Sequence, residues 1–204
     1  MQIRQRLVAL LGLILFAGCT GPSEPITDDF SDPDSGWRSA SAEAFTRGYD
    51  SGQYLIRIDV PDWFVWATSG LRYSDVSIEV TARSEGMTDN HYGVLCRQSD
   101  KGAYYFAISA DGYYAIFLQN EDKTLTPLTG DAMLRSSLIH KGTEPNQLLA
   151  VCEGEELTFY INGEQVTQIT DDTLSHGDVG MAAGTAANAT ATLVWFDDMT
   201  ISKP

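Results

Sequence analysis

The sequence is poor in cysteine, histidine and basic residues, and these shortages exclude several classes of function. Its 204 residues contain three cysteines and three histidines. The histidines, His91, His140 and His176, are widely separated, and no His-Glu-x-x-His pattern occurs, so zinc-hydrolase chemistry is not indicated. No serine lies in a nucleophile elbow, which argues against a serine hydrolase of the α/β type.

Positive charge is scarce as well. The 13 lysines and arginines are outnumbered by 28 aspartates and glutamates, which gives a net charge of −15. A chain this acidic is repelled by nucleic acids and by anionic lipid surfaces. We therefore expect no nucleic-acid partner.

Long apolar runs are limited to the N-terminus. The run Leu7–Gly18 has twelve residues, fewer than the roughly 20 that a membrane-spanning helix needs. It follows Arg4 and Arg6, which is the layout of a secretory signal peptide, here predicted over residues 1–18. Its removal takes away two arginines and no acidic residue, which changes the net charge from −15 to −17.

The end of this segment is typical of a bacterial lipoprotein. Leu15–Cys19 is similar to a lipobox, although Phe16 replaces the usual leucine. We predict that Cys19 carries the lipid and that residues 19–25 tether a domain of residues 26–204 to the membrane, outside the cytoplasm. The alternative is an ordinary signal peptide followed by an incidental cysteine.

Lipidation of Cys19 leaves two cysteines for the folded domain. Cys96 and Cys152 both lie in apolar segments typical of strands. Because exported proteins fold in an oxidising compartment, we predict a disulfide between them. Two buried free thiols are the alternative.

Over most of residues 26–204, short segments typical of β-strands alternate with segments of turn residues. Asn162-Gly163 predicts a type I′ hairpin turn, whereas Asp131–His140 is expected to be a connector with one helical turn. The expected strands are Ile26–Phe30, Phe45–Tyr49, Gln53–Val60, Trp63–Ala67, Val76–Ala82, Gly93–Arg97, Tyr104–Ser109, Tyr113–Gln119, Thr124–Leu128, Asn146–Cys152, Glu156–Ile161, Glu164–Thr170, Val179–Ala183 and Thr192–Ser202. With no long amphipathic helix and no repeat, this pattern predicts an all-β fold, a two-sheet antiparallel β-sandwich or jelly roll.

The aromatic stretch Gly93–Gln119 is the expected centre of this fold. A two-residue turn at Asp111-Gly112 would place Ser109 opposite Tyr114. We assign Tyr104, Phe106 and Ile108 to the core because they form the more hydrophobic set. In that register Tyr105 and Tyr114 share the other face, as a partly exposed aromatic platform.

Several segments resemble the concanavalin A-like lectin/glucanase superfamily, near its laminin-G-like and 3-keto-disaccharide-hydrolase-like members. They are DDFSD…GW, SDVSIEVTA, YGVLCRQSDKGAYYFAISADGYYAI, SSLIHKGTEPNQLLAVC, LTFYINGEQV, DVGMAAGT and VWFDDMTI. The resemblance covers Ile26–Ile201 and implies a jelly roll. It does not by itself imply an activity.

Glycan binding is one function that the resemblance suggests, because sugar rings stack on exposed aromatic side chains. The candidate residues are Trp63, Trp66, Tyr92, Tyr105, Tyr113 and Tyr114, with Arg97 and Asn90 as polar neighbours. The alternative for each is ordinary packing in a sandwich.

A structural calcium ion is also suggested, where the N- and C-terminal strands of such jelly rolls meet. Asp28, Asp29, Asp197 and Asp198 are the candidate oxygen ligands, and acidic turn residues without an ion are the alternative.

No catalytic residue is assigned. Laminarinase-like members of the superfamily carry Glu-x-Asp-x-x-Glu on one strand, and this sequence has no counterpart. We expect a non-enzymatic module of the bacterial cell envelope that binds a glycan or another envelope component. The alternatives are a hydrolase acting on modified disaccharides or glycosides, implied by the resemblance alone, and a structural envelope lipoprotein.

Overall fold

The computed structural model describes residues 24–189 and 191–204. The predicted signal peptide, Cys19 and most of the tether lie outside the described residues, so lipidation stays a prediction. In the described part of the chain, no helix is long and apolar enough to cross a membrane.

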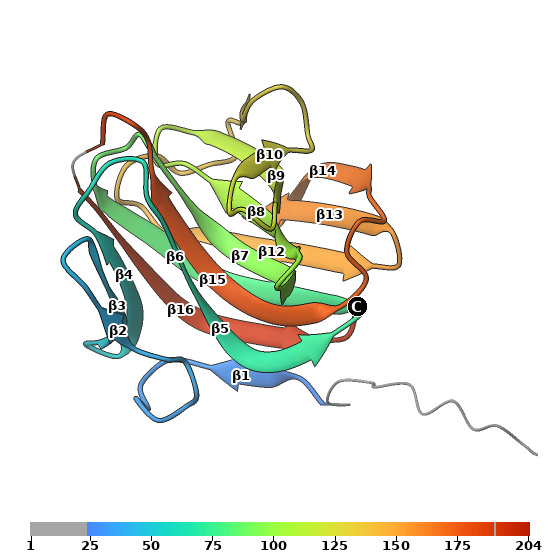
Figure 1. Ribbon diagram of the computed structural model, residues 1–204, viewed down its shortest axis with the longest axis horizontal. Coiled ribbons are helices and arrows are strands. Elements are labelled where there is room, and N and C mark those ends of the chain that lie inside the picture. The colour runs from blue at the N-terminus through green and yellow to red at the C-terminus, as the bar shows by residue number, and fades with distance from the viewer. Residues whose placement is uncertain (1–23, 190) are drawn as a thin grey trace, which may run out of the picture.

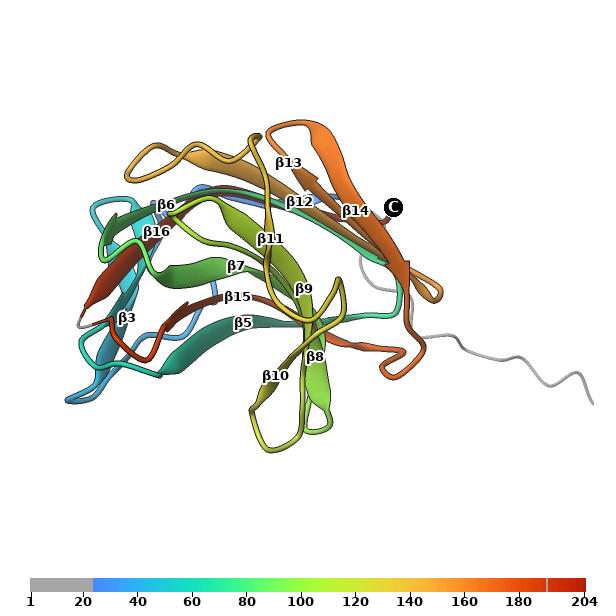
Figure 2. The same cartoon turned by 90° about the horizontal axis from the view of Figure 1, so that it is seen from above.

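Two antiparallel sheets are stacked face to face (Figures 1 and 2). The nine-stranded sheet contains β1 (Ile26–Asp28), β2 (Ala40–Ser41), β3 (Phe45–Asp50), β4 (Gln53–Ile58), β6 (Val76–Gly86), β12 (Asn146–Glu153), β13 (Glu156–Ile161), β14 (Glu164–Thr170) and β16 (Thr192–Ser202). The seven-stranded sheet contains β5 (Phe64–Tyr73), β7 (Asn90–Ser99), β8 (Gly102–Ile108), β9 (Tyr113–Gln119), β10 (Leu125–Pro127), β11 (Leu134–Arg135) and β15 (Gly177–Thr185). The predicted antiparallel β-sandwich is confirmed.

The order of the strands is that of a jelly roll. The nine-stranded sheet runs β14-β13-β12-β6-β16-β4-β3-β2, with β1 beside β16. The other sheet runs β10-β9-β8-β7-β15-β5, with β11 beside β9. Consecutive strands therefore alternate between sheets at several points, and the terminal strands meet, since Ile26 pairs with Ile201.

Alternating apolar residues fill the space between the sheets. In β6 the side chains of Val76, Ile78 and Val80 are all fully buried, while the intervening Ser77 and Glu79 are only half-buried. Because successive residues of a strand point to opposite faces, this alternation alone directs one face of β6 to the core. Strands β4, β12 and β16 show the same alternation and direct one face to the core in the same way.

One predicted turn differs from the structure, and the difference changes the faces of β9. Ser109 N donates to Tyr113 O (2.8 Å) and Gly112 N donates to Ser109 O (3.0 Å), so the hairpin loop has three residues rather than two. Gly112 has a φ of 104°, which glycine tolerates, whereas Asp111 is not left-handed, as a type I′ turn would require.

The extra loop residue moves the register of β9 by one position. Ile108, not Ser109, pairs with Tyr114, and Tyr105 pairs with Phe117. A one-residue slip exchanges the two faces of a strand. Tyr114 and Ile116 therefore join Tyr104 and Phe106 in the core, contrary to the sequence-based assignment.

The Asp131–His140 connector also differs from the prediction. It contains the two-residue strand β11 in place of a helical turn. Leu134 pairs with Tyr114 and Arg135 with Tyr113, whereas β10 pairs with β9 only from Phe117 onward. The connector satisfies the backbone groups of β9 that β10 leaves unpaired, which favours an extended segment there.

The predicted disulfide is confirmed and joins the two sheets. Cys96 of β7 is bonded to Cys152 of β12, across 56 residues of sequence. Closing a loop of this length stabilises the fold by about 4 kcal/mol in the chain-entropy model. Both cysteines are fully buried.

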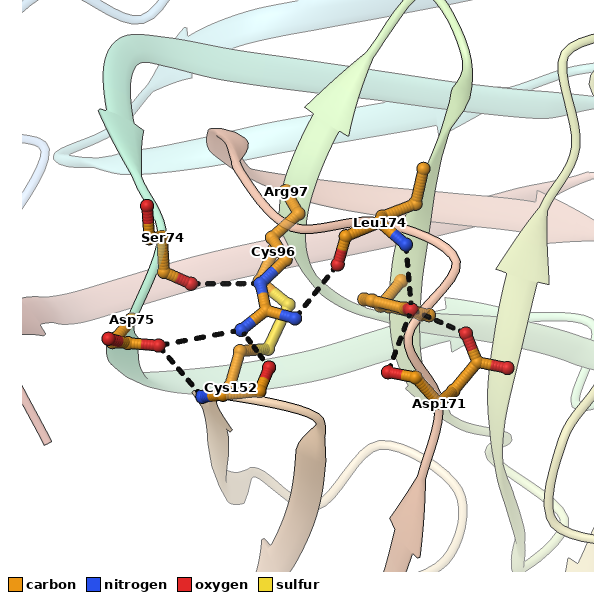
Figure 3. The surroundings of a disulfide bond; sticks show 9 residues. Ser74, Asp75, Cys96, Arg97, Cys152, Asp171 and Leu174 are labelled. Carbon is orange, nitrogen blue, oxygen red and sulfur yellow. Dashed lines mark hydrogen bonds and ion pairs between the residues drawn. A yellow bond between two sulfur atoms is a disulfide. The ribbon is translucent and has the colours of Figure 1, made fainter.

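Beside the disulfide, Arg97 holds three turns together (Figure 3). Its guanidinium donates to Ser74 O (2.8 Å), Leu174 O (2.9 Å) and Gly154 O (2.7 Å), and lies 3.6 Å from the Asp75 carboxylate. The side chain is 1% exposed. A planar fork of donors is suited to such a three-way contact, and a lysine is not.

Backbone geometry explains why Arg97 points inward. Its φ is 55°, and the pairing of β7 with β8 shifts register between Cys96 and Ser99. This bulge breaks the alternation that would otherwise direct the side chain to the opposite face from Cys96. Arg97 is thus a structural residue and not the ligand neighbour that the sequence suggested.

Candidate functional site

The outer face of the seven-stranded sheet, the side that faces away from the other sheet, carries a second apolar cluster. Tyr105 of β8 pairs with Leu95 of β7 and with Phe117 of β9, so the three side chains lie in one row. The buried members of this cluster are Leu95, Ala103, Tyr105, Ala107, Ala115, Phe117 and Ala182, and Phe64, Trp66, Leu125 and Met133 pack against them. The inner face of this sheet already packs into the core. The core therefore does not account for an apolar outer face of this kind, which needs an explanation of its own.

Five rings dominate this face, and we call them the ring cluster: Phe64, Trp66, His91, Tyr105 and Phe117. Phe64 stacks on Trp66 and on His91, each with ring centroids 5.8 Å apart. Tyr105 meets Phe64 edge to face at 5.2 Å and stacks on Phe117 at 5.9 Å. The rings come from β5, β7, β8 and β9, so the cluster spans the sheet.

Small residues bring these rings close to the backbone. Ala182, Gly93, Ala107 and Ala115 form one row across β15, β7, β8 and β9. In the neighbouring row a Cβ on Gly184 would lie 2.2 Å from the His91 ring. His91 can therefore lie flat across β15 only because residue 184 is a glycine.

His91 is held neutral within the ring cluster. Its Nδ1 and the Tyr105 hydroxyl are 3.2 Å apart, and the same hydroxyl donates to Ala182 O at 3.4 Å. Desolvation lowers the pKa of His91 to about 4, because burial disfavours the charged imidazolium. His91 is therefore an uncharged, hydrogen-bonding ring at neutral pH.

A pocket of about 410 Å³ opens at one end of the ring cluster, and we call it the Trp63 pocket. It lies between the segment that enters β5 and the turn between β9 and β10. Its lining comprises Asp62, Trp63, Phe64, His91, Asp122, Lys123, Thr124, Leu125 and Thr185. Trp63 is 45% exposed, the largest exposed fraction among the large hydrophobic residues that the structure describes.

Backbone hydrogen bonds fix this pocket on both sides. Trp63 N donates to the Thr185 hydroxyl (3.1 Å), which in turn donates to Val60 O (2.8 Å). On the opposite side the Asp122 carboxylate accepts from Thr124 N (3.0 Å) and from its hydroxyl (2.6 Å). These hydrogen bonds lower the pKa of Asp122, so its carboxylate is charged and oriented.

Of the residues predicted to bind a ligand, the structure brings three to this face with exposed surface. Trp63 is exposed and Trp66 is half-buried. Tyr113, which is 37% exposed, lies on the same face because it has the parity of Phe117 on β9. Sequence reasoning identified these aromatic residues but missed Phe64 and His91, which carry no local signal.

The other candidates are buried, and the expectation that Tyr105 and Tyr114 form an exposed platform is wrong. Tyr105 is fully buried within the ring cluster, while Tyr114 lies in the core because of the register described above. Tyr92 is also a core residue. Asn90 is 3% exposed and accepts from Ala110 N (3.0 Å), so it supports the β8–β9 turn.

In the described residues, three of the four aspartates proposed for calcium, Asp28, Asp29 and Asp198, line one pocket of about 520 Å³. No group of three or more histidine, cysteine, aspartate or glutamate side chains in the described part of the chain is placed to hold a metal. Asp28 accepts from Phe30 N (2.8 Å), Ser35 Oγ (2.6 Å) and Trp37 Nε1 (3.0 Å). Asp197 accepts from Gln53 Nε2 (2.9 Å), so both carboxylates organise the local chain.

A second pocket, of about 510 Å³, lies at the opposite end of β15. Its lining is polar and of mixed charge: Arg72, Gln98, Ser99, Asp100, Lys101, Thr173, Leu174, Ser175, His176 and Asp178. It lacks the aromatic walls that most small-molecule sites have. The Trp63 pocket is therefore the better candidate site.

Comparison with solved structures identifies the architecture. The carbohydrate-binding module CBM66 from Bacillus subtilis matches with a TM-score of 0.57 and 16% identity, over 80% of this chain and 94% of the module. The fold is a concanavalin A-like jelly roll. A Bacillus licheniformis β-glucanase matches with a TM-score of 0.65 and 10% identity, over 88% of this chain and 98% of the enzyme. A Bacillus subtilis protein with a galectin-like fold matches with 0.65 and 9%, over 87% and 94%.

Sequence identities this low show that the fold is shared and do not show a shared function. No family model matches the sequence, and no curated protein matches it either. The resemblance read from the sequence is confirmed at the level of the concanavalin A-like fold.

The burial of His91 predicts a pH dependence of stability. Its pKa is about 4 in the folded protein and about 6.5 in an unfolded chain. Between these values the unfolded state binds more protons, so the free energy of unfolding falls as the pH falls from about 6.5 to about 4, by at most about 3 kcal/mol.

Chemical denaturation of the native protein and of His91→Asn across this pH range measures the effect. Asparagine keeps a polar atom near Nδ1 but does not titrate. The stability of the native protein should decrease more steeply than that of the variant, while every other titrating group contributes equally to both. Parallel curves would show that His91 is not buried in its neutral form.

Proposed function

We propose that this domain is a carbohydrate-binding module and that the Trp63 pocket holds the sugar. The observation that carries the proposal is the exposed indole of Trp63 at the edge of a pocket that also contains oriented polar groups. The apolar C–H face of a sugar ring stacks on such an indole, and the polar groups fix the orientation of the ring.

The polar groups of the pocket suit sugar hydroxyls. The Asp122 carboxylate is held in place by Thr124 and is charged, so it accepts hydrogen bonds from hydroxyls. Asp62 lies on the other side of the pocket, and Lys123 supplies donors. Two carboxylates in an already acidic protein disfavour anionic sugars, so the ligand class is a neutral oligosaccharide.

The structural neighbours support this proposal without deciding it. The carbohydrate-binding module and the β-glucanase share the fold and are both proteins of glycan chemistry by their names. A glycosidase needs a general acid with a raised pKa, whereas the pKa of Asp122 is lowered. Asp122 is therefore not suited to be the general acid of a glycosidase, and hydrolysis of the bound oligosaccharide is an outcome that the experiment below detects.

We also propose that the module is a bacterial lipoprotein anchored through Cys19. The lipobox-like Leu15–Cys19 supports this. The Cys96–Cys152 disulfide supports export, because such bonds persist in oxidising compartments. From Cys19 to Ile26 the chain is seven residues long, which at about 3.3 Å per residue keeps the domain within about 25 Å of the membrane.

A glycan array followed by calorimetry on the domain tests the sugar site. Trp63→Ala should lower the affinity for the best neutral oligosaccharide at least tenfold and change stability little, because the indole is exposed. Trp195→Ala is the matched control, since Trp195 lies on the other sheet beneath Arg83. Equal affinity in Trp63→Ala and the native protein would refute the site, and release of shorter sugars would favour the hydrolase.

Lipidation is tested by fractionating cells that express the full chain. Cys19→Ser should abolish acylation, so the protein should be found as an unprocessed precursor or in the soluble extracytoplasmic fraction. If the variant is processed and partitions with membranes as the native chain does, the lipoprotein proposal is wrong.

A further inference from the structure

One polar side chain within the apolar cluster of the outer face has no partner. Gln119 is fully buried, and neither its Nε2 nor its Oε1 forms a hydrogen bond within the described residues. Leaving both ends of an amide unpaired in an apolar environment is costly. A buried amide that costs stability in this way needs an explanation, and a ligand that binds to it is one.

The register of the strands shows where this amide lies. Gln119 pairs with Ala103 of β8 on one side and with Leu125 of β10 on the other. Directly opposite residues share a face, so the amide lies on the outer face between two members of the apolar cluster. It has the parity of Phe117 and is therefore next to the ring cluster.

The turn that follows Gln119 extends from β9 toward β5. The turn Asn120–Thr124 is closed by Asn120 N donating to Thr124 O (2.8 Å) and by Lys123 N donating to Asn120 O (2.9 Å). From this turn Lys123 reaches across to β5, where its Nζ lies 5.6 Å from the centroid of the Trp66 ring. Lys123 has a φ of 71°, a strained conformation for a residue other than glycine.

The turn is weakly held. Beyond the turn, β10 has only three residues, and it pairs with β9 alone. Asp122, Lys123 and Thr124 are all exposed. The cation–π contact of Lys123 with Trp66 is weak, because the ammonium group stays exposed to water. Within the described residues no hydrogen bond joins the turn to β5, so a movement of the turn away from β5 leaves its internal hydrogen bonds intact.

We propose that Gln119 is a second sugar-contacting residue, in a subsite that the Asn120–Thr124 turn covers in the ligand-free protein. The proposal rests on the proposed function and extends the Trp63 pocket along the outer face. A neutral oligosaccharide supplies both donors and acceptors, so its hydroxyls satisfy the Oε1 and the Nε2 together. The same turn contributes Lys123 to the pocket, so occupation of one site is coupled to opening of the other.

The test is Gln119→Leu, measured for stability and for affinity. Leucine removes an unpaired amide from an apolar site, so the midpoint of thermal unfolding should rise or stay unchanged, with a rise of roughly 2–12 °C if the full penalty is relieved. Affinity for the best oligosaccharide on the array should fall at least tenfold. A residue with a structural role alone would not combine greater stability with weaker binding.

Gln53→Leu is the matched control. Gln53 donates to Asp197 (2.9 Å) and accepts from Arg83 (3.3 Å) on the other sheet. This variant should lose stability and retain its affinity. If Gln119→Leu lowers the unfolding temperature, the amide has a buried partner such as water, and the proposal is overturned.

The remaining outcomes separate this proposal from the proposed function. Equal affinity of Gln119→Leu and the native protein overturns the subsite and leaves the Trp63 pocket intact. Absence of any glycan binding by the native protein overturns both. NMR gives an independent measurement, since the contact between Lys123 and the Trp66 ring should be lost in the complex. A contact that persists would show that the turn does not move and would also overturn the subsite.

Discussion

The register between β8 and β9 is the constraint on which both faces of the seven-stranded sheet depend. The three-residue loop at Ala110–Gly112 pairs Ile108 with Tyr114 and Tyr105 with Phe117. One set of rings therefore enters the core and the other forms the outer face. A loop shorter by one residue would exchange these sets on β9 and would leave Tyr105 without the ring on which it stacks.

A clamp at the far end of β7 fixes the surroundings of this hairpin. The Cys96–Cys152 disulfide joins the sheets, and Arg97 ties three turns to the end of β7 (Figure 3). His91 is the second residue of the same strand, about 20 Å away from Arg97 at 3.3 Å per residue. The clamp is thus separate from His91 and from the part of the Trp63 pocket that His91 lines. Figure 2 shows how far β8, β9 and β10 curve away from β5 and β15.

Much of the fold was predictable from sequence, but less of the site. Strands β9, β13, β14 and β16 have the predicted limits because alternation and turn residues mark them locally. The pair Asp111-Gly112 does not determine the length of its loop, since it suits both a type I′ turn and the last part of a three-residue loop. The three-residue loop is favoured by Asn90, a residue of another strand that accepts a hydrogen bond from Ala110 N. Likewise, the burial of Tyr105 and Arg97 depends on neighbours that no local pattern reveals.

The central claim is that the outer face of the seven-stranded sheet binds sugar while the nine-stranded sheet does not. The four tryptophans report on it directly, because Trp63 and Trp66 lie on or beside the outer face, Trp37 is buried and Trp195 lies on the other sheet. The measurement is a two-dimensional NMR titration of their indole N–H signals with the best neutral oligosaccharide. The account predicts that the Trp63 and Trp66 signals shift and those of Trp37 and Trp195 do not; a shift confined to Trp195, or binding without any change at Trp63 and Trp66, would contradict it.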